Sequence, residues 1–244
     1  THTVPGLARF RCNLYSHLGA PGVCLRVIPL TLPTLEELNL PPALREIAAG
    51  RAGLVLIAGE SGSGRTTVLN TLVDLINEST IAKIITIEEP VEFVHGAKKA
   101  LVSHRSVGSD APSFEQAMGQ ALQQDPDVIV LGKLPDAATL RLALRAVEGG
   151  RKVIAVVDSP TAVQTIDRVL ELLPAAEQRS ALVRLAGGLD AVIALRLATT
   201  KDGQRRPVVE ILRGGPVTTR SLLEGRGGDL GVFMTGRQNG MQTF

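Results

Sequence analysis

Short apolar runs recur along most of the chain. They predict strands at residues 54–58, 84–87, 128–131, 153–157, 191–197 and 208–212. Several stretches between these runs have apolar residues at helical spacing, as in the segment 68–76. Strands that alternate with helices are typical of a largely parallel sheet with crossover helices. We therefore predict an α/β core.

The first thirty residues follow another pattern. Residues 9–15 alternate in polarity, residues 19–22 are suited to a turn, and residues 23–28 can return as a second strand. This pattern predicts a β-hairpin. Four prolines then mark a linker with one short amphipathic segment, 34–39. Because strand-like alternation begins almost at the first residue, we expect further sequence upstream.

The amino-acid composition argues against some classes of function. The 26 basic and 24 acidic side chains give a net charge of +2, and they form no basic block. One Tyr, five Phe and no Trp leave few platforms on which bases could stack, so we expect no nucleic-acid partner. No apolar run approaches the roughly 18 residues of a membrane span. We expect a cytoplasmic protein whose Cys12 and Cys24 are small core residues.

One glycine-rich segment lies between the first predicted core strand and the helix that follows. It predicts a phosphate-binding loop with these residues: Gly59, Ser61, Gly62, Ser63, Gly64, Arg65, Thr66 and Thr67. Glycines allow backbone N–H groups to turn toward a phosphate, and the helix N-terminus adds partial positive charge. We expect ATP or ADP as the ligand, with Mg²⁺ as a possible companion.

This loop departs from the usual pattern at one position. Arg65 occupies the place where a Lys normally reaches the β- and γ-phosphates. Arg is a broad planar fork and Lys a compact point charge, so the exchange is not conservative inside a tight loop. We expect phosphate affinity to survive and the geometry around the γ-phosphate to change.

Five segments carry a family resemblance, namely residues 5–11, 85–93, 125–132, 165–168 and 240–243. Together they resemble the PilT-like family of type IV pilus retraction and secretion ATPases, over nearly the whole chain. The resemblance implies a RecA-like P-loop core at 49–244. It also implies that residues 1–30 are the last hairpin of an N-terminal α+β (PAS-like) domain, with a linker and short helix at 31–48.

The same resemblance implies how the protein would work. Family members act as hexamers at the inner face of the membrane, so we expect an inner-membrane platform protein and active paralogous ATPases as partners. Glu88 and Glu92 match the two retained acids of the family's Asp box, and Thr66 with Glu88 would contact Mg²⁺. The arginines expected near the nucleotide are Arg9, Arg11, Arg26 and Arg105.

Other positions depart from the family pattern. The family's Walker B strand ends in Gly-Glu, whereas this chain has Gly132-Lys133. An ammonium group cannot accept a proton from water and would repel the metal. The two histidines of the family's His box, which lie near the γ-phosphate, align with Arg151 and Asp158. Asp158 would bring negative charge toward a polyanion.

These departures favour a degenerate paralogue that binds nucleotide but hydrolyses it weakly or not at all, as a subunit or regulator of pilus machinery. One alternative is an active hexameric motor, in which Arg65 still holds phosphate and Glu88 or Glu92 replaces the missing carboxylate. A third possibility is a folded relic that binds nothing. Nucleotide binding and turnover distinguish the three.

Overall fold

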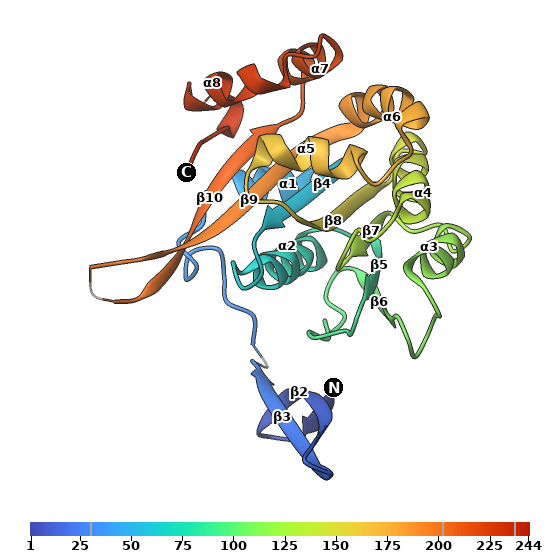
Figure 1. Cartoon of the computed structure of the whole chain (residues 1–244), viewed down its shortest axis with the longest axis vertical. Coiled ribbons are helices and arrows are strands. Elements are labelled where there is room, and N and C mark those ends of the chain that lie inside the picture. Colours follow the sequence, from blue (N-terminus) through green and yellow to red (C-terminus); the bar gives the residue numbers. More distant parts are fainter. Residues whose placement is uncertain (30, 202, 237) are drawn as a thin grey trace.

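A seven-stranded sheet forms the centre of the molecule (Figure 1). The computed structural model describes residues 1–29, 31–201, 203–236 and 238–244; residue 30, the expected boundary between hairpin and linker, lies outside them. The sheet has the order β10-β9-β4-β8-β7-β5-β6, and every neighbouring pair is parallel except β9 and β10. Its strands are β4 (Gly53–Gly59), β5 (Lys83–Glu88), β6 (Leu101–Ser106), β7 (Val128–Leu131), β8 (Lys152–Asp158), β9 (Leu189–Thr199) and β10 (Arg205–Arg213). The predicted α/β fold with a largely parallel sheet is confirmed.

Helices cover both faces of this sheet. On one face lie α1 (Ala43–Ala49) and α2 (Arg65–Ser79). The other face carries α3 (Phe114–Leu122), α4 (Ala137–Glu148), α5 (Ala162–Leu170), α6 (Ala175–Gly188), α7 (Pro216–Leu223) and α8 (Leu230–Thr235). Successive strand residues point to opposite faces, so Leu56 and Ile57 of β4 enter different cores. Both faces of the sheet are therefore dry, which explains the nearly continuous apolar runs in the sequence.

A three-stranded antiparallel sheet precedes the core. It consists of β1 (His2–Val4), β2 (Ala8–His17) and β3 (Ala20–Ile28), and it projects from the larger unit (Figure 1). The β2–β3 hairpin reverses at Leu18 and Gly19, which both have positive φ, so the turn comes earlier than predicted. The segment 34–39 forms turns, and α1 follows it.

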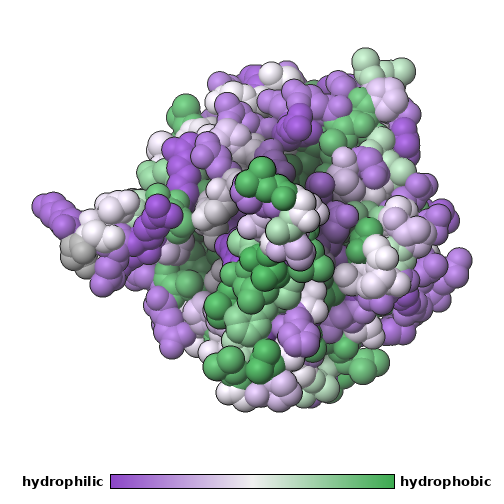
Figure 2. Space-filling model, turned by 60° about the horizontal axis from the view of Figure 1, so that its bottom comes forward, coloured by the Kyte–Doolittle hydropathy of each residue, from purple (hydrophilic) through white to green (hydrophobic). Residues whose placement is uncertain are grey.

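The hairpin carries apolar side chains on its surface. Figure 2 shows an apolar strip across this side of the molecule, and the exposed residues of the hairpin include Leu14, Val23, Leu25 and Val27. Cys12 and Cys24 are exposed as well, so the expectation that they are core residues is wrong. The projecting hairpin has too little chain packed on it to bury them. None of the helices among the described residues has the length and apolar character needed to cross a bilayer.

The parallel topology brings several loops to one edge of the sheet. β4, β5, β7 and β8 run in the same direction, so their carboxyl ends share that edge. The hairpin is tied to the segment after β5, where Arg9 donates to the Val91 carbonyl at 3.1 Å and Arg11 pairs with Glu92 at 3.1 Å. This edge is where a ligand site is expected in an open α/β sheet.

Candidate nucleotide-binding site

The glycine-rich loop connects β4 to α2. At Gly59 a Cβ atom would lie 2.3 Å from the Ser63 Oγ atom and 2.7 Å from the Leu195 carbonyl oxygen, so only glycine fits. Gly64 caps α2 in the left-handed region at φ 97°, and no side chain caps the helix start. The first N–H groups of α2 are thus left for another acceptor, which is the condition for binding a phosphate.

The loop opens into a cavity of about 600 Å³, within the usual range for ligand pockets. Residues 61–68 line one side of it. Among the described lining residues, the positively charged side chains are those of Arg11, Arg26, Arg65 and Arg205, and the one carboxylate is that of Glu92. The Ser63 Oγ atom is buried here without a hydrogen-bond partner in the described part of the chain. The excess positive charge, the orphaned hydroxyl and the uncapped helix fit the phosphates of a nucleotide.

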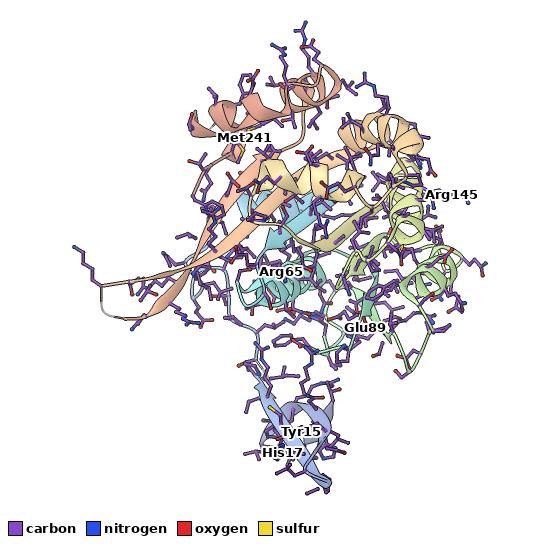
Figure 3. The ribbon with its side chains drawn as sticks, in the orientation of Figure 1. Tyr15, His17, Arg65, Glu89, Arg145 and Met241 are labelled. Carbon is purple, nitrogen blue, oxygen red and sulfur yellow. The ribbon has the colours of Figure 1, made fainter. Side chains whose placement is uncertain are left out.

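Arg65 lies at the first turn of α2, at the edge of the sheet that faces the hairpin (Figure 3). Its guanidinium donates to the Val157 carbonyl at 3.0 Å and forms an ion pair with the carboxylate of Asp158. β4 pairs with β8 so that Gly59 stands beside Asp158, which explains the contact. Asp158 is therefore neutralised by the loop's own arginine and is not left as bare negative charge.

Glu88 ends β5 and is 4% exposed. It packs against Gly132 at the end of β7, where a Cβ atom would lie 3.1 Å from the Glu88 Cγ atom. Its Oε1 atom has no hydrogen-bond partner among the described residues. Burial raises the pKa of Glu88 to about 7, while the neighbouring Thr86 hydroxyl opposes that rise. A carboxyl with a pKa near neutrality can exchange protons with a water molecule.

The other predicted acid and Lys133 lie nearby in the fold. Glu92 lines the cavity, where Arg11 holds it. Lys133 directly follows Gly132 and is exposed, and it is not among the described residues that line the cavity. Its effect on the site would act from the end of β7, next to the strand that carries Glu88.

The predicted arginines separate into two groups. Arg11 and Arg26 line the cavity. Arg9 is engaged with the Val91 carbonyl, and Arg105 of β6 reaches Gln120 at 3.4 Å, so neither lines it. Sequence reasoning missed Arg205, whose only signal was a pair of arginines just before the predicted strand 208–212.

Arg151 does not belong to this edge of the sheet. It precedes β8 and pairs with Asp125 at 2.8 Å, whereas Asp158 ends the same strand. Seven residues of extended chain separate the two by about 20 Å. The expectation that both aligned positions lie near the γ-phosphate is therefore wrong for Arg151 within this chain.

The two residues predicted to contact Mg²⁺ lie at the same edge of the sheet. Thr66 is exposed on the first turn of α2 and lines the cavity, and Glu88 is the buried carboxylate of the same edge. Mg²⁺ is usually held by one or two such groups together with substrate phosphates. Among the described residues there is no group of three or more His, Cys, Asp or Glu that could form a cage. Thr66 and Glu88 as Mg²⁺ contacts stay a prediction.

In comparisons with known proteins, the chain is similar to proteins of type IV pili and of type II/IV secretion systems. The family described as type II/IV secretion system protein matches residues 16–224. The chain is 38% identical over 243 residues to a twitching motility protein of Neisseria gonorrhoeae, covering 99% of this chain and 65% of that protein. It is 37% identical over 242 residues to the type IV pilus retraction ATPase PilT of Pseudomonas aeruginosa, covering 99% and 70%. The chain thus spans about two thirds of these relatives.

Solved structures similar to this chain come from the same group of proteins. The crystal structure of the pilus retraction motor PilT with bound ADP superposes with a TM-score of 0.92 at 33% identity, covering 99% of this chain and 69% of that one. The ATPase DotB of Legionella pneumophila gives a TM-score of 0.84 at 27% identity, covering 97% and 67%.

Proposed function

Because this chain belongs to the type II/IV secretion system protein family, we propose that it is an ATP-binding and ATP-hydrolysing subunit of a type IV pilus or related secretion machine. The observation that carries the proposal is the pairing, at one edge of the sheet, of an uncapped phosphate loop with a buried carboxylate. The loop supplies the binding site, and Glu88 supplies a proton acceptor. The ADP bound to the similar motor PilT supports the choice of ligand.

Different groups of the chain bind the phosphates and accept the proton. ATP, with Mg²⁺, would supply the phosphoryl group that is transferred to water. The N–H groups that begin α2 hold the phosphates, and the guanidinium groups of Arg11, Arg26 and Arg205 surround them with positive charge. Glu88 takes a proton from water once it is ionised, which its pKa of about 7 allows near neutral pH.

A specific observation favours a second candidate function. Arg65 is engaged with Asp158, and Lys133 occupies the position that follows the Walker B strand. Both features would slow hydrolysis without preventing binding, because the phosphate loop itself is intact. The second candidate is therefore a nucleotide-binding subunit or regulator with negligible turnover, as the sequence departures favoured.

Assembly and organisation are further parts of the proposal. By resemblance to the family, we expect a hexamer of this chain, or of this chain with active paralogues, docked on a membrane platform protein. Residues 1–30 would then act as part of a separate N-terminal module, 31–48 as a linker and 49–244 as the ATPase core. The contacts of Arg9 and Arg11 with the segment after β5 support a module that reaches the nucleotide site.

The test measures binding and single-turnover hydrolysis in the same preparation. We expect micromolar to millimolar ATP binding and measurable hydrolysis in the wild type. We expect Glu88→Gln to reduce the rate by about 10²–10⁴-fold with little effect on binding, because it removes the proton acceptor. Glu171→Gln is the matched control and should leave both quantities unchanged, since it alters an exposed acid outside the cavity. Binding without hydrolysis would favour the second candidate, and no binding would contradict both.

A further inference from the structure

Two histidines outside the cavity form a stacked pair beside the sheet. His95 lies in the segment after β5, and His104 lies on β6. Their ring centroids are 5.7 Å apart with the planes at 17°. The side chain of His95 is 1% exposed. Buried polar side chains in such an arrangement must satisfy their hydrogen bonds among themselves, so each partner constrains the next.

The protonation of His104 is fixed by its neighbours. The backbone N–H of His95 donates to the Nε2 atom of His104 at 3.0 Å, so that nitrogen must carry a lone pair. Burial lowers the pKa of His104, which keeps the ring neutral. A neutral imidazole has one N–H, which is therefore on Nδ1. This group lies 2.8 Å from the Oγ1 atom of Thr86 and donates to it.

The hydroxyl hydrogen of Thr86 remains available to donate a hydrogen bond. Its oxygen already accepts from His104, so the hydrogen must point elsewhere. Thr86 and Glu88 are two residues apart on β5, and side chains at this spacing lie on the same face of a strand. A hydrogen bond from the Thr86 hydroxyl to the Glu88 carboxylate would stabilise the ionised form and so oppose the effect of burial on the Glu88 pKa.

The opposite end of the network reaches the phosphate loop. Asn70 of α2 is buried, and its Nδ2 atom donates to the Thr66 carbonyl at 2.9 Å. Its Oδ1 atom must then accept, and it lies 2.8 Å from the Nε2 atom of His95, which donates. The first turn of α2 is thus connected through Asn70 to His95, one member of the stacked pair, by hydrogen bonds of defined direction.

We propose that neutral His104, protonated on Nδ1, is a positioning residue that orients the Thr86 hydroxyl toward Glu88, and that His95 and Asn70 link this arrangement to the phosphate loop. The proposal rests on the proposed function, because it assigns His104 a role in orienting the proton acceptor. His104 itself touches neither the cavity nor the carboxylate. Its part is to hold one hydroxyl in one orientation.

Three substitutions separate this role from simple packing. His104→Leu removes both hydrogen bonds. His104→Gln can restore them, because its side-chain oxygen accepts from the His95 N–H while its amide nitrogen donates to Thr86. Thr86→Val keeps the shape of the side chain and removes the hydroxyl. A residue needed only to fill space would give similar results for Leu and Gln.

The first readout uses the protein without nucleotide. Imidazole ¹⁵N spectra at pH 7, assigned with His104→Gln, should show His104 as the neutral Nδ1–H tautomer. The ¹³C signal of the Glu88 carboxyl, assigned with Glu88→Gln, should move in His104→Leu and in Thr86→Val and stay near its wild-type position in His104→Gln. The exposed His17 provides the control, since His17→Leu should leave the Glu88 signal unchanged.

The second readout is single-turnover hydrolysis with ATP affinity measured alongside. We expect His104→Leu to lower the rate by about 10-fold or more at nearly unchanged affinity, and His104→Gln to recover most of it. A charged or Nε2-protonated His104, or a Glu88 signal indifferent to His104→Leu, would overturn the inference. A wild type that does not hydrolyse ATP would overturn the proposed function instead, while the spectra still decide the inference.

Discussion

The charged residues at the two ends of β8 differ in burial and in the partners that surround them. At its amino end, Lys152 is 1% exposed and donates to the Ile47 carbonyl at 2.6 Å and to Asp190 at 3.2 Å. Arg213 reaches the same carboxylate at 3.3 Å. At its carboxyl end, Asp158 is largely exposed and pairs with Arg65 of the phosphate loop. Close by, Ser63 and Glu88 each bury an oxygen atom without a partner.

This difference separates charges that stabilise the fold from those available for chemistry. A buried ion is tolerated when partners compensate for the loss of water, as at Lys152. Unpartnered buried oxygens and a partly exposed ion pair are costly or weak, and they persist where a ligand can complete them. The carboxyl edge of the sheet therefore has unmet hydrogen-bonding capacity at the place where the phosphate loop lies.

The largest effect is expected at the amino end. Asp190→Ala should lower the free energy of unfolding by about 3–5 kcal/mol, because it leaves the buried ammonium of Lys152 without its carboxylate. Asp158→Ala is the matched change at the carboxyl end and should cost about 1 kcal/mol or less, since that pair is partly in water. Urea unfolding at pH 7 measures both. Equal losses would contradict the distinction between the two ends.

A smaller effect is expected from Glu88. Its pKa is raised from 4.5 to about 7 in the folded chain, so the folded state binds the proton more tightly than the unfolded state. Stability from this group is thus full below pH 4.5 and falls as the pH rises to about 7, by about 3 kcal/mol in total. Glu88→Gln removes this loss.

The measurement is the stability difference between Glu88→Gln and the wild type as a function of pH. The variant should gain relative to the wild type between pH 4.5 and 7 and keep that gain at pH 8. Glu92→Gln is the control, because its carboxylate is paired with Arg11. A difference that does not vary with pH would show that Glu88 is not held in a desolvated site.

The smallest effect concerns the Arg65–Asp158 pair. Asp158→Asn should increase ATP affinity about fivefold, because Arg65 no longer has to leave a carboxylate to meet the phosphates; this corresponds to about 1 kcal/mol. Asp167→Asn, an exposed change on α5 with the same loss of charge, should leave the affinity unchanged. Isothermal titration calorimetry at fixed ionic strength measures both. A weaker affinity in Asp158→Asn would mean that the carboxylate assists binding.

Local features of the fold were predictable from the sequence. The six predicted strands lie in β4, β5, β7, β8, β9 and β10 because buried parallel strands are almost continuously apolar. β6, Leu101–Ser106, was missed because only its first two residues are apolar and it lies at the edge of the sheet. The phosphate loop was predictable because its motif is contiguous.

Features that depend on pairing register were not predictable. The contact of Arg65 with Asp158 joins residues 93 positions apart and requires β4 to lie beside β8 in one register. Arg205 reaches the cavity only because β10 folds back along β9. Arg151 was misplaced because matching a motif by sequence does not reveal that a whole strand separates its two positions.

The most direct test of this account is a structure of the chain with Mg²⁺ and a slowly hydrolysed ATP analogue at millimolar concentration. We expect the phosphates to lie against the N–H groups that begin α2, with Arg65 turned from Asp158 toward them and Glu88 facing the terminal phosphate. An empty loop with the Arg65–Asp158 pair intact, or an analogue bound elsewhere, would contradict the claim that the carboxyl edge of this sheet is a nucleotide site.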